Sequence, residues 1–119
     1  MLKGLNATGE LPNEFADLTY LNYINLTRNF LYGSIPISWE SLPLVTLGLS
    51  GNLINGTIPR EMGNISTLEE LLLSGNNFEG SLPETFRNLK NLTEFKIDGS
   101  SISGSIPGYI GNWTKLRWL

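Results

Sequence analysis

The sequence contains no cysteine and no histidine. Without them the chain has no disulfide, no thiol chemistry and none of the nitrogen and sulfur ligands that usually hold zinc. A nucleophile activated by histidine is excluded as well. We therefore expect no catalytic constellation, no metal site and no cofactor in this chain.

Basic residues and long apolar runs are also scarce. The 8 lysines and arginines are outnumbered by 11 acidic residues, which gives a net charge of -3. A nucleic-acid partner would require a basic surface, so it is not expected. No apolar run reaches the ~18 residues that suggest a membrane span. No apolar signal sequence is recognisable either, since Lys3 and Gly4 interrupt the opening.

Asparagine glycosylation sequons (N-x-S/T) are more frequent than chance predicts, which is about two for this composition. Some of the excess comes from repetition, because two of the sequons occupy the same position in a repeat. The excess still favours a chain that is exposed to the secretory pathway and faces the outside of the cell. The candidate glycosylation sites are Asn6, Asn25, Asn55, Asn64, Asn91 and Asn112.

A unit of 24 residues recurs along the chain, most clearly at residues 65–88, which read ISTLEELLLSGNNFEGSLPETFRN. A repeat of this length is typical of a solenoid, in which each unit packs against its neighbours. We divide the single domain 1–119 into a partial repeat 1–17, repeats 18–41, 42–64, 65–88 and 89–112, and a partial repeat 113–119.

The positions within the unit predict an α/β solenoid, a right-handed superhelix. The L-x-x-L-x-L run alternates as a short strand does, so stacked units should form a parallel sheet on the concave face. Leu2 should then align with Leu26 in the next unit. A proline in each unit precedes a short helical or 3-10 turn on the convex face.

Other repeated positions have structural roles. Buried asparagine amides should pair backbone groups of neighbouring coils, and Ser100, which replaces one of them, should weaken that step. Glycines suit a turn that needs positive φ. The expected asparagine ladder is Asn29, Asn52 and Asn76, and the turn glycines are Gly9, Gly33, Gly56, Gly80 and Gly104. The expected inward positions are Phe15, Trp39, Met62, Phe86 and Ile110, followed by Leu18, Leu42, Ile65, Leu89 and Trp113.

The template L-x-x-L-x-L-x-x-N-x-F-x-G-x-L-P at residues 68–83 resembles the plant-specific leucine-rich repeat, and the resemblance covers essentially the whole chain. Segments such as LTRNFLYGSIPISWESLP and IGNWTKL are similar to the ectodomains of plant receptor-like serine/threonine kinases, above all those with a malectin-like domain. The resemblance implies an ectodomain that precedes a membrane span and a cytoplasmic kinase. It marks this chain as a fragment without caps, span or kinase.

Outward residues of successive units should form columns across the concave sheet, about 4.8 Å apart. The columns place acidic residues at the centre and an aromatic residue at each end. Such a face suits a basic group of a peptide or protein, because tyrosine and tryptophan often anchor interfaces. The candidate ligand-binding residues are Tyr23, Glu69, Glu70, Leu72, Glu94, Lys96, Asp98 and Trp118.

Two features of this face allow other interpretations. Glu70 and Glu94 are predicted neighbours, but a glycosidase pair needs a cleft that separates the two pKa values, so ordinary surface is favoured over catalysis. A glycan on Asn25 would shield one end of the face and move binding toward the segment between Glu69 and Trp118.

The resemblance leaves two functions open. The first is an extracellular recognition module of a plant receptor-like kinase, which binds a peptide, protein or co-receptor through its concave face. The alternative is a secreted inhibitor of a cell-wall-degrading enzyme, similar to polygalacturonase-inhibiting proteins. The apolar ends of an uncapped array further predict marginal stability and end-to-end association.

Overall fold

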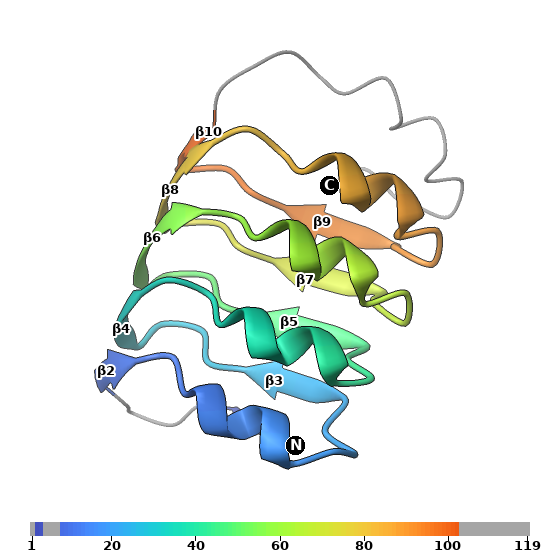
Figure 1. Ribbon diagram of the computed structural model, residues 1–119. Helices are drawn as coiled ribbons and strands as arrows, with labels where there is room; N and C mark the ends of the chain where they lie inside the picture. The colour runs from blue at the N-terminus through green and yellow to red at the C-terminus, as the bar shows by residue number, and fades with distance from the viewer. Residues whose placement is uncertain (1, 4–7, 103–119) are drawn as a thin grey trace.

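The computed structural model describes residues 2–3 and 8–102, which form a stack of similar coils (Figure 1). Each complete coil contains a short strand, a turn, a second short strand and a 3-10 helix, in that order. The first strands are β1 (Leu2–Lys3), β3 (Tyr23–Asn25), β5 (Thr46–Gly48), β7 (Glu70–Leu72) and β9 (Glu94–Lys96). The second strands are β2 (Thr8–Glu10), β4 (Phe30–Gly33), β6 (Leu53–Thr57), β8 (Asn77–Gly80) and β10 (Ser101–Ile102). The helices are η1 (Asn13–Asp17), η2 (Ile37–Ser41), η3 (Arg60–Asn64) and η4 (Glu84–Asn88).

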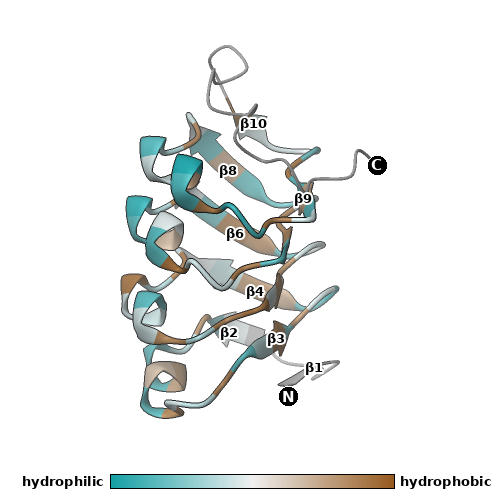
Figure 2. Ribbon diagram, turned by 90° about the vertical axis from the view of Figure 1, so that its right-hand side faces the viewer, coloured by the Kyte–Doolittle hydropathy of each residue, from teal (hydrophilic) through white to brown (hydrophobic). Residues whose placement is uncertain are grey.

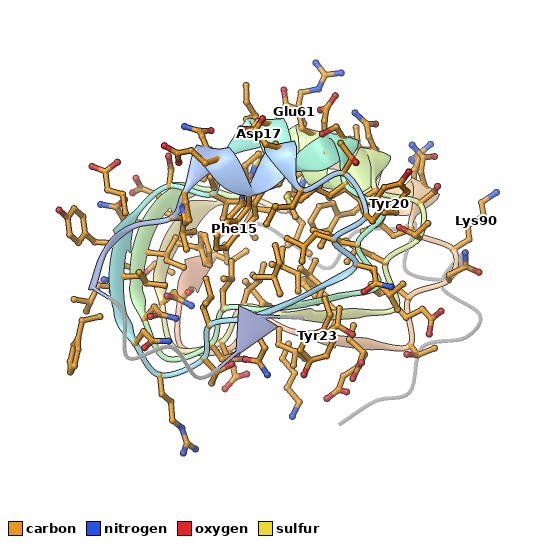
Figure 3. All side chains as sticks on the ribbon, turned by 90° about the horizontal axis from the view of Figure 1, so that it is seen from below. Phe15, Asp17, Tyr20, Tyr23, Glu61 and Lys90 are labelled. Atoms are coloured by element: carbon orange, nitrogen blue, oxygen red, sulfur yellow. The ribbon has the colours of Figure 1, made fainter. Side chains whose placement is uncertain are left out.

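The two sets of strands form two parallel sheets. The concave sheet has the order β1-β3-β5-β7-β9, and the lateral sheet has the order β10-β8-β6-β4-β2. Figure 3, which looks along the stack, shows the helices on one side, the concave sheet opposite, and the lateral sheet joining the two. The predicted α/β solenoid is confirmed, and the lateral sheet is an addition that the repeat pattern did not predict. No helix within the described residues is long and apolar enough to cross a membrane.

The concave sheet has the predicted register over most of its width. Thr46 pairs with both Tyr23 and Glu70, and Glu70 pairs with Glu94. The prediction for the first coil was wrong, because Leu2 pairs with Ile24 and not with Leu26. A shift of two residues leaves the alternation of inward and outward positions unchanged, so the repeat pattern alone does not distinguish the two registers.

The lateral sheet is staggered relative to the repeat. Gly33 pairs with Ile54 and Gly56 pairs with Phe78, two residues short of the next glycine in each case. Each of these glycines therefore lies beside a bulky inward residue of the following coil. The backbone φ is positive, as predicted, at Gly9, Gly33, Gly56 and Gly80, and Gly104 lies outside the described residues.

Buried asparagines connect adjacent coils. The Nδ2 atom of Asn52 donates to the carbonyls of Leu26 and Leu49, and its Oδ1 atom accepts from the amides of Asn29 and Leu31. Asn76 repeats the pattern one coil further on, where it donates to Leu49 and Leu73 and accepts from Ile54. The repeat needs an asparagine at this position because its side-chain amide can both donate to carbonyls and accept from backbone N–H groups.

At Ser100, which stands at the corresponding position of the next coil, the hydroxyl donates to the carbonyl of Asn76 at 3.0 Å. A hydroxyl has only one hydrogen to donate, so it cannot bridge two carbonyls as Asn52 does.

The core is one continuous stack of apolar side chains between the two sheets and the helices. Trp39 is fully buried, stacks on Phe15 with ring centroids 5.8 Å apart, and donates from Nε1 to the carbonyl of Pro12. The inward slots predicted from the repeat are buried at Leu42, Ile65, Leu89, Met62 and Phe86.

Leu18 is the exception, since it is 51% exposed. The prediction that it lies in the core was wrong, because within the described residues only one neighbouring coil can cover it. The two remaining inward candidates, Ile110 and Trp113, lie outside the described residues.

Candidate functional site

The candidate site is the outward face of the concave sheet, where strands of three residues present two outward positions each. Tyr23 and Asn25 lie on this face in β3, and Glu70 and Leu72 lie on it in β7. Tyr23 points away from the core in Figure 3. The sequence folds this way locally because leucine or isoleucine between the two outward positions is buried, as at Ile24 and Leu71.

The predicted columns place Glu70 beside Glu94, but each carboxylate has its own partner. Glu70 accepts a hydrogen bond of 2.8 Å from the hydroxyl of Thr46, which lies on β5, on the side away from Glu94. Glu94 forms an ion pair of 3.5 Å with Lys96 on its own strand. The two carboxylates thus have different partners, one on β5 and one on β9.

A second polar pair lies just after the strands. The hydroxyl of Ser74 donates to Asp98 at 2.5 Å across adjacent coils. This bond holds the pKa of Asp98 below its ordinary value, with smaller contributions from the residue's own backbone amide and from Lys96. Asp98 therefore stays a carboxylate over the whole physiological pH range and keeps the C-terminal part of the face acidic.

Asn25 occupies the N-terminal part of the face beside Tyr23. Its Oδ1 atom accepts from both the amide and the hydroxyl of Thr27, and its Nδ2 atom donates to the hydroxyl of Tyr23 at 3.4 Å. The side chain also leans over β5, where a Cβ added to Gly48 would lie 3.1 Å from Oδ1. The half-buried amide of this sequon is therefore already engaged in the fold.

The structure brings together most of the predicted face. Glu69 lies one residue before β7 and is exposed, Leu72 is half-buried, and Lys96 is exposed at the end of β9. Trp118 lies outside the described residues. Within the described residues no three acidic side chains converge as metal ligands.

The outward residues of the lateral sheet were not among the predicted site residues. Phe30, Tyr32 and Leu53 are exposed by 66%, 50% and 50%. The signal was present in the sequence, because Phe30-Leu31-Tyr32-Gly33 alternates outward and inward positions as a strand does. A shallow groove of about 820 Å³ runs beside this sheet, between the strands and the helices, and is lined among others by Ile37, Thr57 and Arg60.

Comparisons with known proteins agree with this architecture. A family model described as Leucine Rich Repeat matches residues 43–65 and 67–89. A probable leucine-rich repeat receptor-like serine/threonine-protein kinase of Arabidopsis thaliana is 36% identical over 72 residues, which is 60% of this chain and 7% of that protein. The leucine-rich repeat receptor protein kinase MSP1 of Oryza sativa subsp. japonica is 39% identical over 64 residues, which is 54% of this chain and 5% of that protein.

Solved structures show the same fold. The ectodomain of the Arabidopsis thaliana receptor kinase GASSHO1/SCHENGEN3, in complex with CASPARIAN STRIP INTEGRITY FACTOR 2, superposes with a TM-score of 0.90 at 35% identity, over 92% of this chain and 13% of that one. The BIR3–SERK2 complex from the same plant gives 0.85 at 32% identity, over 97% of this chain and 65% of that one. The chain thus spans only a small part of the receptor kinases that it resembles.

Proposed function

We propose that this chain, which is similar to the leucine-rich-repeat ectodomains of plant receptor-like kinases, is part of the extracellular recognition module of such a receptor. The concave face binds an extended peptide or a protein segment, and no chemistry takes place on it. The observation that carries the proposal is the similarity of the array to plant receptors solved with ligands, among them a plant peptide hormone receptor in complex with RGF2 and the HAESA ectodomain in complex with a peptide hormone ligand. A soluble enzyme inhibitor is less favoured, because the relatives named above are receptor kinases.

The charge of the face supports a ligand with basic side chains. Glu69, Glu70 and Asp98 lie on neighbouring coils, and Lys96 is paired with Glu94. Basic groups of a peptide that lies across the strands would meet successive carboxylates about 4.8 Å apart. Tyr23 provides an aromatic surface at the N-terminal end of the same face. A co-receptor is a further candidate partner, by analogy with the BIR3–SERK2 complex.

Binding of an extended peptide that contains two arginines tests this proposal by calorimetry. The double variant Glu70→Gln and Glu94→Gln should weaken binding about 3- to 10-fold at low salt, because each removed charge is part of an exposed interaction of modest strength. The difference should shrink at high salt.

The matched control is Glu14→Gln with Glu40→Gln, which removes the same charge from exposed positions on η1 and η2. If the control weakens binding as much as the test variant does, the peptide responds only to net charge and the assignment of the concave face is wrong. A variant with unchanged affinity would contradict the role of the two glutamates.

A further inference from the structure

The lateral sheet carries an exposed apolar strip, which consists of Phe30, Tyr32 and Leu53. Tyr32 on β4 pairs directly with Leu53 on β6, and Phe30 lies two residues before Tyr32 on the same face. Half or more of each side chain is exposed. Figure 2 shows the β4 and β6 strands of this sheet with hydrophobic segments. A contiguous exposed apolar patch on a monomer is often a functional surface.

A glycosylation sequon lies on the same strand and faces the same way. Asn55, Gly56 and Thr57 continue β6 beyond Leu53, and the side chains of Asn55 and Thr57 are exposed. Asn55 is two residues from Leu53, which places both on the outward face about 7 Å apart. Within the described residues no hydrogen bond engages the side-chain amide of Asn55, so its Nδ2 atom is available for modification.

We propose that Asn55 carries an N-linked glycan whose first sugar rings lie over Tyr32 and Leu53. The modification forms a bond between Nδ2 of Asn55 and the anomeric carbon of N-acetylglucosamine. The bond between that carbon and a lipid-pyrophosphate donor breaks, the lipid pyrophosphate leaves, and the amide loses one proton. The inference rests on the proposed extracellular function, because this transfer takes place in the secretory pathway.

The neighbours of Asn55 set the direction of the glycan. On one side Asn55 pairs with Asn77 of β8, and Thr57 pairs with Glu79, so that side is polar. Toward β4 the neighbouring residue is the small Ser34, and Leu53, with Tyr32 beside it, lies two residues back along β6. One face of a pyranose ring consists of C–H groups, which lose water favourably against an aromatic ring or a leucine methyl. The sugars therefore cover the apolar strip and leave the polar strands exposed.

The other described sequons lack this combination. Asn25 is engaged by Thr27 and Tyr23, and Nδ2 of Asn91 donates to the carbonyl of Ser66 at 3.2 Å. Asn64 is exposed at the end of η3 and, like Asn55, has no side-chain hydrogen bond within the described residues, but it is far from the lateral strip in the coil. Asn64 is therefore a natural control, an accessible sequon without an apolar neighbour of this kind.

The test uses the full chain secreted from plant cells. Mass spectrometry of glycopeptides should find Asn55 occupied. Thermal unfolding should show that Asn55→Gln lowers the melting temperature by about 3 °C or more, whereas Asn64→Gln changes it by about 1 °C or less. In a background with Tyr32→Thr and Leu53→Thr, which keeps strand-forming residues in the strip, Asn55→Gln should have no further effect.

Each other outcome contradicts the inference in a recognisable way. If Asn55 is bare while Asn64 carries a glycan, the inference is wrong and the extracellular function stands. If every sequon of the secreted chain is bare, both are in error. If the glycosylated chain dimerises in sedimentation experiments and Tyr32→Thr with Leu53→Thr abolishes the dimer, a second copy covers the strip. If Asn55→Gln lowers the melting temperature equally in the natural chain and in the background with Tyr32→Thr and Leu53→Thr, the sugars do not contact the strip.

Discussion

At the scale of single residues, the side chain of Asn52 shows how the repeat solves the problem of its buried turn. Its amide donates to the carbonyls of Leu26 and Leu49 and accepts from the amides of Asn29 and Leu31. Asn52 itself is 5% exposed, so water cannot replace these bonds. One side chain thus satisfies backbone groups in two coils.

We expect Asn52→Ala to lower the free energy of unfolding by about 2–4 kcal/mol, because several buried backbone groups lose their partner together. Urea denaturation measures the change. The control is Asn77→Ala, which removes an exposed asparagine from β8 and should cost about 0.5 kcal/mol or less. Equal costs for the two variants would mean that the buried bonds contribute nothing beyond those at the surface.

Asp98 provides a prediction about pH. The hydroxyl of Ser74 lowers the pKa of Asp98, so the folded state favours the carboxylate and gains stability above the ordinary pKa of about 3.9. That gain is lost as the pH falls through the lower, folded pKa. Ser74→Ala should raise the pKa of Asp98 toward its ordinary value in an NMR titration of the carboxyl group. An unchanged titration curve would exclude Ser74 as the main cause.

At the scale of elements, the concave strands are short, and alternation alone decides which residues they bury. Leu71 is fully buried between two outward neighbours in β7, and Leu72 lies half-exposed on the candidate site. The two leucines are adjacent and chemically identical. Substituting each leucine in turn therefore distinguishes residues that stabilise the core from residues that bind a ligand on the concave face.

Leu71→Ala should destabilise the chain by about 2–5 kcal/mol, since it leaves a cavity in a closely packed core. Leu72→Ala should cost about 1 kcal/mol or less and should instead weaken binding of the peptide probe. Chemical denaturation and calorimetry on both variants provide the comparison. The reverse order of stabilities would mean that the strand has the opposite register.

The sequence predicted the concave sheet and its columns but not the lateral sheet, for a physical reason. From β3 to β9 the concave strands follow a leucine pattern that repeats at the period of the coil, so their register can be read from the sequence, whereas β1 pairs two residues out of step. Lateral strands such as β4 pair two residues out of step with the repeat, as at Gly33 and Ile54. An even shift keeps inward residues inward, and it depends on how the coils stack, which no single repeat specifies.

The same distinction applies to the candidate site. The positions of Glu70 and Glu94 were predictable because they follow from strand register. Their partners, Thr46 and Lys96, were not predictable, because side chains choose between neighbours on two coils according to rotamer and distance. The exposure of Leu18 was missed because the repeat pattern assigns it a slot without showing how many coils cover that slot.

At the scale of the whole molecule, the described chain is a one-dimensional stack in which each coil contacts the next. Both sheets join consecutive coils only, and the buried asparagines do the same. Asn29 and Asn52 share the carbonyl of Leu26 as an acceptor, and Asn52 and Asn76 share that of Leu49. Stability in such an array is a sum of coil terms and nearest-neighbour terms.

This arrangement predicts how substitutions combine. Each asparagine of the ladder can be replaced by serine, the residue that the chain already has at Ser100. We expect the pair Asn29→Ser with Asn52→Ser to show a coupling free energy of about 0.5 kcal/mol or more, because the two side chains bond the same carbonyl. The pair Asn29→Ser with Asn76→Ser shares no acceptor and should be additive within about 0.5 kcal/mol.

Double-mutant cycles in urea measure both quantities with the same single variants. Serine is preferred to alanine here because its hydroxyl still bonds one carbonyl, as Ser100 does with Asn76, so the double variants keep part of the ladder. If the Asn29 and Asn76 variants coupled as strongly as the Asn29 and Asn52 variants, the coupling free energy would extend beyond neighbouring coils. In that case a ligand on one coil of the concave face would alter the stability of coils that it does not touch.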